Sequence, residues 1–145
     1  MIARHLVDVH ILLTGQDEIL LSLRRSGDEF EARWHLPAGK LEAGEPAALG
    51  AVREAREEAG VEIDPADLRL VHTAHVVSPN RAARLGLFFH TERWRGTPEN
   101  REPDKCYELR WFPLGALPAD LIRYPALGIE GWRSGAPYSE FGWAE

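Results

Sequence analysis

The segment from Pro46 to Ala59 constrains the fold more than any other part of the chain, because it has the pattern of a helix packed on a sheet. Pro46 suits the first turn of a helix, and Gly60 stands where a glycine cap ends one. Small apolar residues recur along one face at helical spacing, namely Ala48, Val52, Ala55 and Ala59. Side chains this small allow close approach, so we expect this helix to lie directly against a sheet.

Short apolar runs elsewhere in the chain predict strands. Thr14–Asp17 is a typical hairpin connection between the first two runs, and a basic loop from Ser78 to Arg84 separates the next two. The expected strands are residues 6–13, 19–25, 68–77, 85–93 and 107–112, with a second helix near 126–132. Strands mixed with helices, and no internal repeat, favour one α+β domain.

Length, charge and cysteine content exclude several classes of protein. The chain has 145 residues, the size of one domain, and its net charge of −6 disfavours a nucleic-acid polymer as partner, since phosphate binding takes a basic surface. The single cysteine, Cys106, excludes an internal disulfide and a multi-cysteine zinc site. No apolar run approaches the roughly 20 residues of a membrane helix, so we expect a cytoplasmic protein without membrane association.

Three carboxylates share one face of the expected helix. Glu54, Glu57 and Glu58 stand at i, i+3 and i+4, where like charges repel by about a few tenths of a kcal/mol per pair. Two interpretations are open from this face alone. It could be a solvated surface with salt bridges to Arg53 and Arg56, or a site for Mg²⁺, a hard cation that takes carboxylate oxygens.

The spacing around these carboxylates favours the metal site. Gly39 is followed after five residues by Glu45, and seven residues later by Arg53-Glu54. With Glu57-Glu58 and Gly60-Val61, this resembles the loop–helix–loop Nudix box at every fixed position, although Ala55 is smaller than the apolar residue usual there. The flanks are similar to those of Nudix hydrolases as well, in Leu36–Gly39, Trp94–Gly96 and Glu102–Lys105 leading to Trp111-Phe112.

The resemblance, which spans roughly residues 5–118, implies the Nudix fold, a mixed β-sheet sandwiched between α-helices (α/β/α). It implies a single domain over residues 1–145, with the catalytic loop-helix-loop at 39–61 and a C-terminal helix and aromatic tail at about 118–145. The tail around Phe141–Trp143 is expected either to cover the core or to meet a second subunit in a homodimer.

Because Nudix hydrolases cleave a diphosphate linked to another moiety, very often a nucleoside, the resemblance implies a Mg²⁺-dependent pyrophosphohydrolase, with Mn²⁺ as a substitute cation. The leading substrate is a nucleoside triphosphate or its oxidised form. The alternatives are a dinucleoside polyphosphate, a nucleotide sugar or a non-nucleoside pyrophosphate. A non-catalytic ligand-sensing Nudix module is a further alternative, which the intact glutamates disfavour.

Carried over position by position, the resemblance assigns catalytic and metal-binding residues. The expected catalytic residues are Glu54, Glu57, Glu58, Arg53 and Glu45, in which Arg53 holds a glutamate and Glu45 gives outer support. The expected metal ligands are Gly39, through its carbonyl, and Glu54, Glu57, Glu58 and Glu102. Glu102 is preferred over Glu99 and Glu108 because of its distance from the Trp-x-Gly turn.

Contacts to a small phosphorylated substrate are expected from arginines, which can screen phosphates, and from aromatic rings, which can stack on a base. These residues are Arg25, Trp34, Arg81, Arg84 and Tyr107. Each also has a plainer interpretation, as a solvated arginine or a partly buried aromatic residue. No role is expected for the histidines, since His72 and His75 should face opposite sides of a strand.

Overall fold

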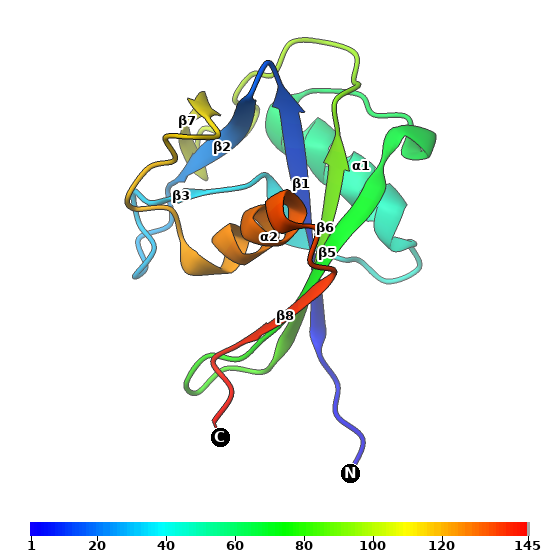
Figure 1. Ribbon diagram of the computed structural model, residues 1–145, viewed down its shortest axis with the longest axis vertical. Helices are drawn as coiled ribbons and strands as arrows, with labels where there is room; N and C mark the ends of the chain where they lie inside the picture. Colours follow the sequence, from blue (N-terminus) through cyan, green and yellow to red (C-terminus); the bar gives the residue numbers. More distant parts are fainter. Residues whose placement is uncertain (145) are drawn as a thin grey trace.

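A computed structural model describes residues 1–144, which form eight strands, two α-helices and one short 3₁₀ helix (Figure 1). The strands are β1 (Leu6–Gly15), β2 (Glu18–Arg24), β3 (Trp34–His35), β4 (Ala38–Lys40), β5 (Arg69–Val76), β6 (Arg84–Thr91), β7 (Cys106–Pro113) and β8 (Tyr138–Phe141). The helices are α1 (Ala47–Ala59), η1 (Pro65–Asp67) and α2 (Arg123–Ser134).

The strands form one mixed sheet in the order β3-β2-β1-β6-β5-β8, with β4 paired to β1 and β7 paired to β2. β1 runs parallel to β6 over Leu6–Leu13, and its last two residues pair with β2. The short strand β4 pairs antiparallel with the first half of β1, so that Gly39 lies opposite Val9. This pairing fixes the segment that leads into α1.

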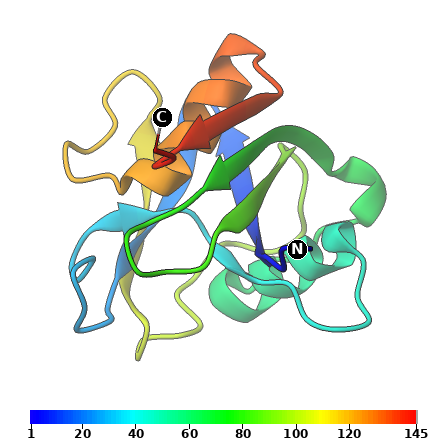
Figure 2. The same ribbon diagram turned by 90° about the horizontal axis from the view of Figure 1, so that it is seen from below.

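The sheet lies between the two α-helices, as Figures 1 and 2 show from two directions. α1 packs the predicted stripe of small residues, including Ala55 and Ala59, against the side chains of Val9 and Ile11 on one face. On the other face, the core around α2 joins Leu127 and Ile129 to Leu12 and Phe88. The α/β/α architecture expected from the sequence is therefore confirmed, and β1 is buried on both faces as a strand covered by helices must be.

The short elements β3, β4 and η1 are absent from the sequence-based expectation, and three further elements differ from it. β6 begins at Arg84, which the sequence alone places in a loop, because its guanidinium pairs with the buried Asp8 of β1 through two bonds of 2.7 Å. α2 is longer than residues 126–132, since it spans Arg123–Ser134 and is capped by Gly135 in the left-handed conformation. The aromatic tail forms β8, which adds a parallel strand beside β5 and so belongs to the sheet of this chain.

Within residues 1–144, neither α-helix combines the length and the apolar content that a membrane span requires.

The close approach of α2 to β6 generates a stability prediction. A methyl group at Gly128 would stand 1.9 Å from the Phe88 ring, whereas one at Gly115 would meet nothing within 4 Å. We expect Gly128→Ala to lower the free energy of unfolding by about 1–3 kcal/mol, because overpacking outweighs the gain in helix propensity. Gly115→Ala is the control and should change it by less than about 0.5 kcal/mol. Urea denaturation measures both, and equal midpoints would contradict the packing described for α2.

Candidate functional site

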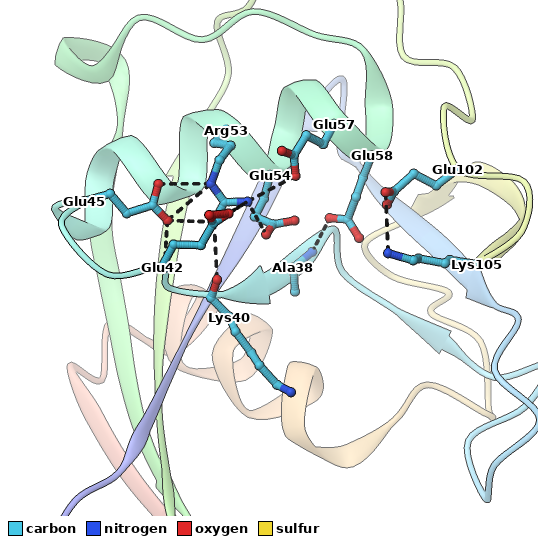
Figure 3. Close-up of polar contacts among 10 residues, drawn as sticks. All are labelled: Ala38, Lys40, Glu42, Glu45, Arg53, Glu54, Glu57, Glu58, Glu102 and Lys105. Atoms are coloured by element: carbon cyan, nitrogen blue, oxygen red, sulfur yellow. Dashed lines mark hydrogen bonds and ion pairs between the residues drawn. The ribbon is translucent and has the colours of Figure 1, made fainter.

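The carboxylates expected to act together line one cavity of about 610 Å³, which we call the acidic cavity. Helix α1 forms one wall, β4 lies opposite, and the connection between β6 and β7 closes a third side (Figure 3). The residues that reach the cavity from these elements include Glu54, Glu57, Glu58, Gly39, Lys40, Glu102 and Lys105.

Arg53 ties the carboxylates of α1 to those of the preceding loop. Its guanidinium nitrogens lie 2.6 Å from Glu45 and 2.8 Å from Glu54, and the same group lies 3.1 Å from Glu57 and 3.3 Å from Glu42 (Figure 3). One planar cation thus serves four carboxylates, which a lysine ammonium could not do. The hydrogen bonds from Arg53, followed by one from the Glu42 backbone, lower the pKa of Glu45 to about 2.

Glu54 is buried and Glu58 partly buried in the wall of the acidic cavity. Burial raises the pKa of Glu58 well above its ordinary value, and the nearby charge of Glu54 raises it further. Glu58 accepts a hydrogen bond of 2.8 Å from the Ala38 backbone N–H, which anchors it to β4. Burial also raises the pKa of Glu54, against the opposing effect of Arg53. Both groups have lost water without full compensation, a state that a bound cation would relieve.

Gly39 allows the close contact between β4 and α1. A methyl group there would stand 2.0 Å from the Glu54 Oε1 atom, so only glycine lets this carboxylate lie against the strand backbone. The donors brought together are carboxylate and backbone oxygens, which suit Mg²⁺ or Mn²⁺. Among residues 1–144 no three His, Cys, Asp or Glu side chains already form a metal-ligand group, and the carboxylates are engaged by Arg53 and Ala38 instead. The residues fit such a cation chemically, and their role as ligands stays a prediction.

The loop that carries Glu102 is docked on the end of α1. The backbone N–H groups of Glu99 and Arg101 donate to the carbonyls of Ala59 and Glu58 at 2.9 and 3.1 Å, which satisfies orphan carbonyls at the helix end. The side chain of Asn100 then accepts from the Glu102 N–H at 3.0 Å and donates to the Cys106 carbonyl at 2.7 Å. These bonds fix the backbone from which Glu102 reaches the cavity.

A second cavity of about 570 Å³ adjoins the acidic cavity, since Arg24, His35 and the three residues of β4 line both. We call it the arginine pocket because six cationic residues line it, namely Arg24, Arg33, Lys40, Arg81, Arg84 and Arg123. Within the described chain, Asp8 is the one carboxylate in its lining, and it is bound by Arg84 and by the Tyr124 hydroxyl at 2.8 Å. The arginine pocket therefore carries an excess of positive charge, whereas five glutamates and five cationic residues balance in the lining of the acidic cavity.

His10 forms part of the wall of the arginine pocket and is almost fully buried. Its ring stacks on Phe88 with centroids 4.2 Å apart, and neither ring nitrogen has a hydrogen-bond partner among residues 1–144. Burial lowers the pKa of His10 to about 4 although the charge of Asp8 opposes the shift, so the imidazole is neutral at pH 7.

The five expected substrate contacts are placed differently by the structure. Arg25 lines the acidic cavity, and Arg81 and Arg84 line the arginine pocket, where Arg84 is committed to Asp8. Trp34 is only 6% exposed and packs edge-on against another core ring, so it lies in the core rather than in a cavity. Tyr107 is exposed beneath the Arg25 guanidinium and lines neither cavity.

Several residues around the two cavities carry no motif and were not predicted. Glu42 stands among the variable positions of the box, and Asn100 in an ordinary polar loop. The cationic residues of the arginine pocket come from β2, β4, β6, α2 and two loops, so the charge of the pocket is visible only after folding. The cationic residues that it adds to the expected set are Arg24, Arg33, Lys40 and Arg123.

Replacement of Arg53 by lysine tests the carboxylate network. Lysine keeps the charge but cannot reach four carboxylates at once, so we expect Arg53→Lys to lower the free energy of unfolding by about 1–3 kcal/mol. Arg56→Lys is the matched control, because Arg56 is exposed and its nearest ion pair, with Glu62, is 3.8 Å long. Chemical denaturation of both variants without divalent cations measures the difference. Equal losses in the two variants would contradict the network.

The neutral, buried His10 predicts a pH dependence of stability. Because its folded pKa of about 4 lies below the ordinary 6.5, the unfolded chain binds more protons between these values. The contribution of neutral His10 to the free energy of unfolding is therefore fully present above pH 6.5. It is lost as the pH falls toward 4, by an amount on the order of 3 kcal/mol. His10→Phe keeps the ring and removes both unpartnered nitrogens, so the unfolding free energy should fall less steeply over this range.

The free energy of unfolding of His10→Phe at pH 8 isolates the effect of packing, because the imidazole is uncharged in both the folded and the unfolded protein at this pH. If the unfolding free energies of the parent protein and of His10→Phe changed equally with pH between 6.5 and 4.5, His10 would not contribute to the pH dependence of stability.

Comparison with known proteins agrees with this geometry. The chain is 31% identical over 122 residues to 8-oxo-dGDP phosphatase NUDT18 of Homo sapiens and 37% identical over 108 residues to NAD-capped RNA hydrolase NudC of Pseudomonas aeruginosa. These matches cover 82% and 74% of this chain but only 35% and 36% of the relatives, so the chain spans about a third of the length of these curated relatives.

The fold has close counterparts among solved structures. The crystal structure of a MutT NUDIX hydrolase from Burkholderia pseudomallei matches with a TM-score of 0.81 and 26% identity, covering 88% of this chain and 98% of that one. The family model of the NUDIX domain matches residues 4–127, a range that includes the complete box. The chain therefore belongs to the NUDIX family.

Proposed function

We propose that this chain is a Mg²⁺-dependent pyrophosphohydrolase that cleaves the phosphoanhydride of a nucleoside diphosphate-linked substrate. The observation that carries the proposal is that the four glutamates expected as metal ligands line one cavity, next to Gly39, where any side chain would collide with Glu54. The intact set favours catalysis over a ligand-sensing module, since binding alone does not require every carboxylate of the box. The four are Glu54, Glu57, Glu58 and Glu102.

The proposed ligands of the cation are these four glutamates with the Gly39 carbonyl. A divalent ion held there neutralises phosphate charge and lowers the pKa of a bound water. Glu58, fixed to β4 by the Ala38 N–H, is proposed to hold its place during turnover. Glu57, whose side chain is 48% exposed, has the freedom to orient the attacking water and accept its proton.

Arg53 and Glu45 are proposed as positioning residues. Arg53 bonds to Glu54 and Glu57, so it sets the direction of both carboxylates, and Glu45 holds Arg53 from the opposite side. Lys40 is proposed to face the diphosphate where the cavities meet, because it lines both and its side chain points away from the Arg53 cluster (Figure 3). Its ammonium offsets the repulsion between an anionic substrate and the acidic cavity.

The arginine pocket is proposed to hold the moiety attached to the diphosphate. Its volume of about 570 Å³ is within the range of small-ligand sites, and Phe30, Tyr124 and Phe141 supply rings in its lining. A nucleoside diphosphate-type substrate is supported by the names of the relatives, an 8-oxo-dGDP phosphatase and a NAD-capped RNA hydrolase. An oxidised nucleoside triphosphate and other diphosphates are the alternative substrates, and the experiment below compares them. We also propose that the protein acts in the cytoplasm.

A substrate panel with a matched mutant tests the proposal. Nucleoside di- and triphosphates with normal and oxidised bases, dinucleoside polyphosphates and nucleotide sugars are incubated with Mg²⁺, and phosphate, pyrophosphate and nucleotide products are quantified. For the best substrate, we expect Glu57→Gln to lower kcat by at least ~10²-fold, the effect of losing a positioned acid–base group. EDTA should abolish turnover.

Glu92→Gln is the matched control, since Glu92 is an exposed glutamate that lines neither cavity. It should retain the parent rate. Full activity of Glu57→Gln, or turnover in EDTA equal to that in Mg²⁺, would overturn the assignment of the site.

A further inference from the structure

The charge of the arginine pocket exceeds what a neutral moiety requires. Six cationic side chains line it against one carboxylate, Asp8, which Arg84 binds through two bonds of 2.7 Å. With Lys40 assigned to the diphosphate, four arginines are left to face the attached moiety, namely Arg24, Arg33, Arg81 and Arg123. His10 and His35 in the same lining are neutral at pH 7, since burial lowers the pKa of each to about 4. Because the chain as a whole has a net charge of −6, the positive charge around this cavity does not follow from the overall composition and is specific to the cavity.

The arginines of the pocket differ in how firmly they are held. Arg84 is fixed by Asp8, whereas three others pair with exposed acids that are not part of the cavity lining: Arg24 with Asp28, Arg81 with Glu29 and Arg123 with Glu130. Such exposed pairs contribute little net stability, so these arginines can exchange their partners for a bound anion at small cost.

Arg33 has the greatest capacity left for a ligand. Its Nε atom makes a long contact of 3.4 Å with the Asp120 carbonyl, and its guanidinium lies 5.9 Å from the centre of the Phe30 ring. Among residues 1–144 it has no ion pair with a carboxylate within 4 Å. The Arg24 guanidinium lies at the same distance from the Phe30 ring, so two cations share one aromatic side chain at the pocket. Paired guanidinium groups beside a ring suit a phosphorylated nucleoside, whose phosphate accepts bidentate hydrogen bonds.

We propose that the moiety recognised by the arginine pocket carries a phosphate of its own, so that the substrate is a diphosphate joined to a nucleoside with a second phosphate on its ribose, and that Arg33 is a specificity-determining residue for this phosphate. This inference rests on the proposed function for the identity of the reaction. The recognition itself is a property of the pocket and is testable without turnover.

Binding of product-like nucleotides tests the recognition. Isothermal titration calorimetry in EDTA, which keeps the acidic cavity free of metal, compares adenosine 5′-monophosphate with adenosine 2′,5′-bisphosphate and adenosine 3′,5′-bisphosphate. We expect at least one bisphosphate to bind roughly tenfold more tightly or better, as charge-assisted hydrogen bonds imply. Arg33→Gln should reduce this ratio to within about threefold of unity. Equal dissociation constants for all three nucleotides, or an unchanged ratio in Arg33→Gln, would overturn the proposal.

Arg69→Gln is the matched control, since it removes the same charge from an exposed residue of β5 outside both cavities, and it should keep the wild-type ratio. Because the readout is a ratio, a general loss of folding in a variant affects all nucleotides alike. A tenfold preference that also collapses in Arg69→Gln would show a long-range charge effect and contradict the role of Arg33.

Hydrolysis separates this inference from the proposed function. Adenosine and guanosine 5′-diphosphates, each with and without a 2′- or 3′-phosphate, are compared by kcat/KM with Mg²⁺, and at least one phosphorylated form should be favoured roughly tenfold or more. Hydrolysis of all forms at equal kcat/KM overturns the inference and leaves the proposed function standing. Tight bisphosphate binding without hydrolysis of any of these diphosphates or of any member of the substrate panel supports the inference and overturns the proposed function.

Discussion

The contact of one arginine with four carboxylates is the interaction on which the site depends. Without Arg53, Glu54 and Glu57 on α1 would lose the cation that offsets their repulsion, and the loop glutamates Glu42 and Glu45 would have no partner on the helix. The guanidinium instead joins the loop to the helix and keeps the acids in a common cavity. A planar group with five donors is needed for this, which gives the arginine of the box a structural reason.

The sheet provides the second condition for the site. β1 is buried on both faces, and β4 is held along its edge so that Gly39 meets Glu54 and the Ala38 N–H meets Glu58. The same short strand separates the acidic cavity from the arginine pocket and lines both. Under the proposed function, a substrate with a diphosphate and a further moiety would cross β4, from the glutamates of the acidic cavity to the cationic lining of the arginine pocket. In that arrangement, residues of β4 would set the distance between the reacting bond and the recognised group.

The sequence predicted much of this arrangement because its strongest signals are local. The small-residue stripe, the Gly60 cap and the spacing of the box lie within one helix and its flanks, so the helix, its buried face and its acidic face could be predicted together. Strand positions followed from apolar runs, with errors where a side chain decided the boundary. For example, β6 begins at Arg84 and not after it, because Asp8, which lies 76 residues earlier in the chain, binds the Arg84 guanidinium.

Features that depend on distant parts of the chain could not be predicted. The arginine pocket collects cations from β2, β4, β6, α2 and two loops, and no spacing rule connects them. Trp34 could not be distinguished from a stacking residue until Phe112 was seen against it. Asn100 acts through the Glu102 N–H in its own loop and the Cys106 carbonyl at the start of β7, and nothing in the residue type indicates this.

Titration of the protein with Mn²⁺, followed by the electron paramagnetic resonance signal of the free ion, tests most directly whether the carboxylate turn of α1 gathers a divalent cation. We predict that the protein removes Mn²⁺ from solution in a saturable manner and that added Mg²⁺ releases it. The account would be contradicted by a free-ion signal that rises with total Mn²⁺ as it does in buffer.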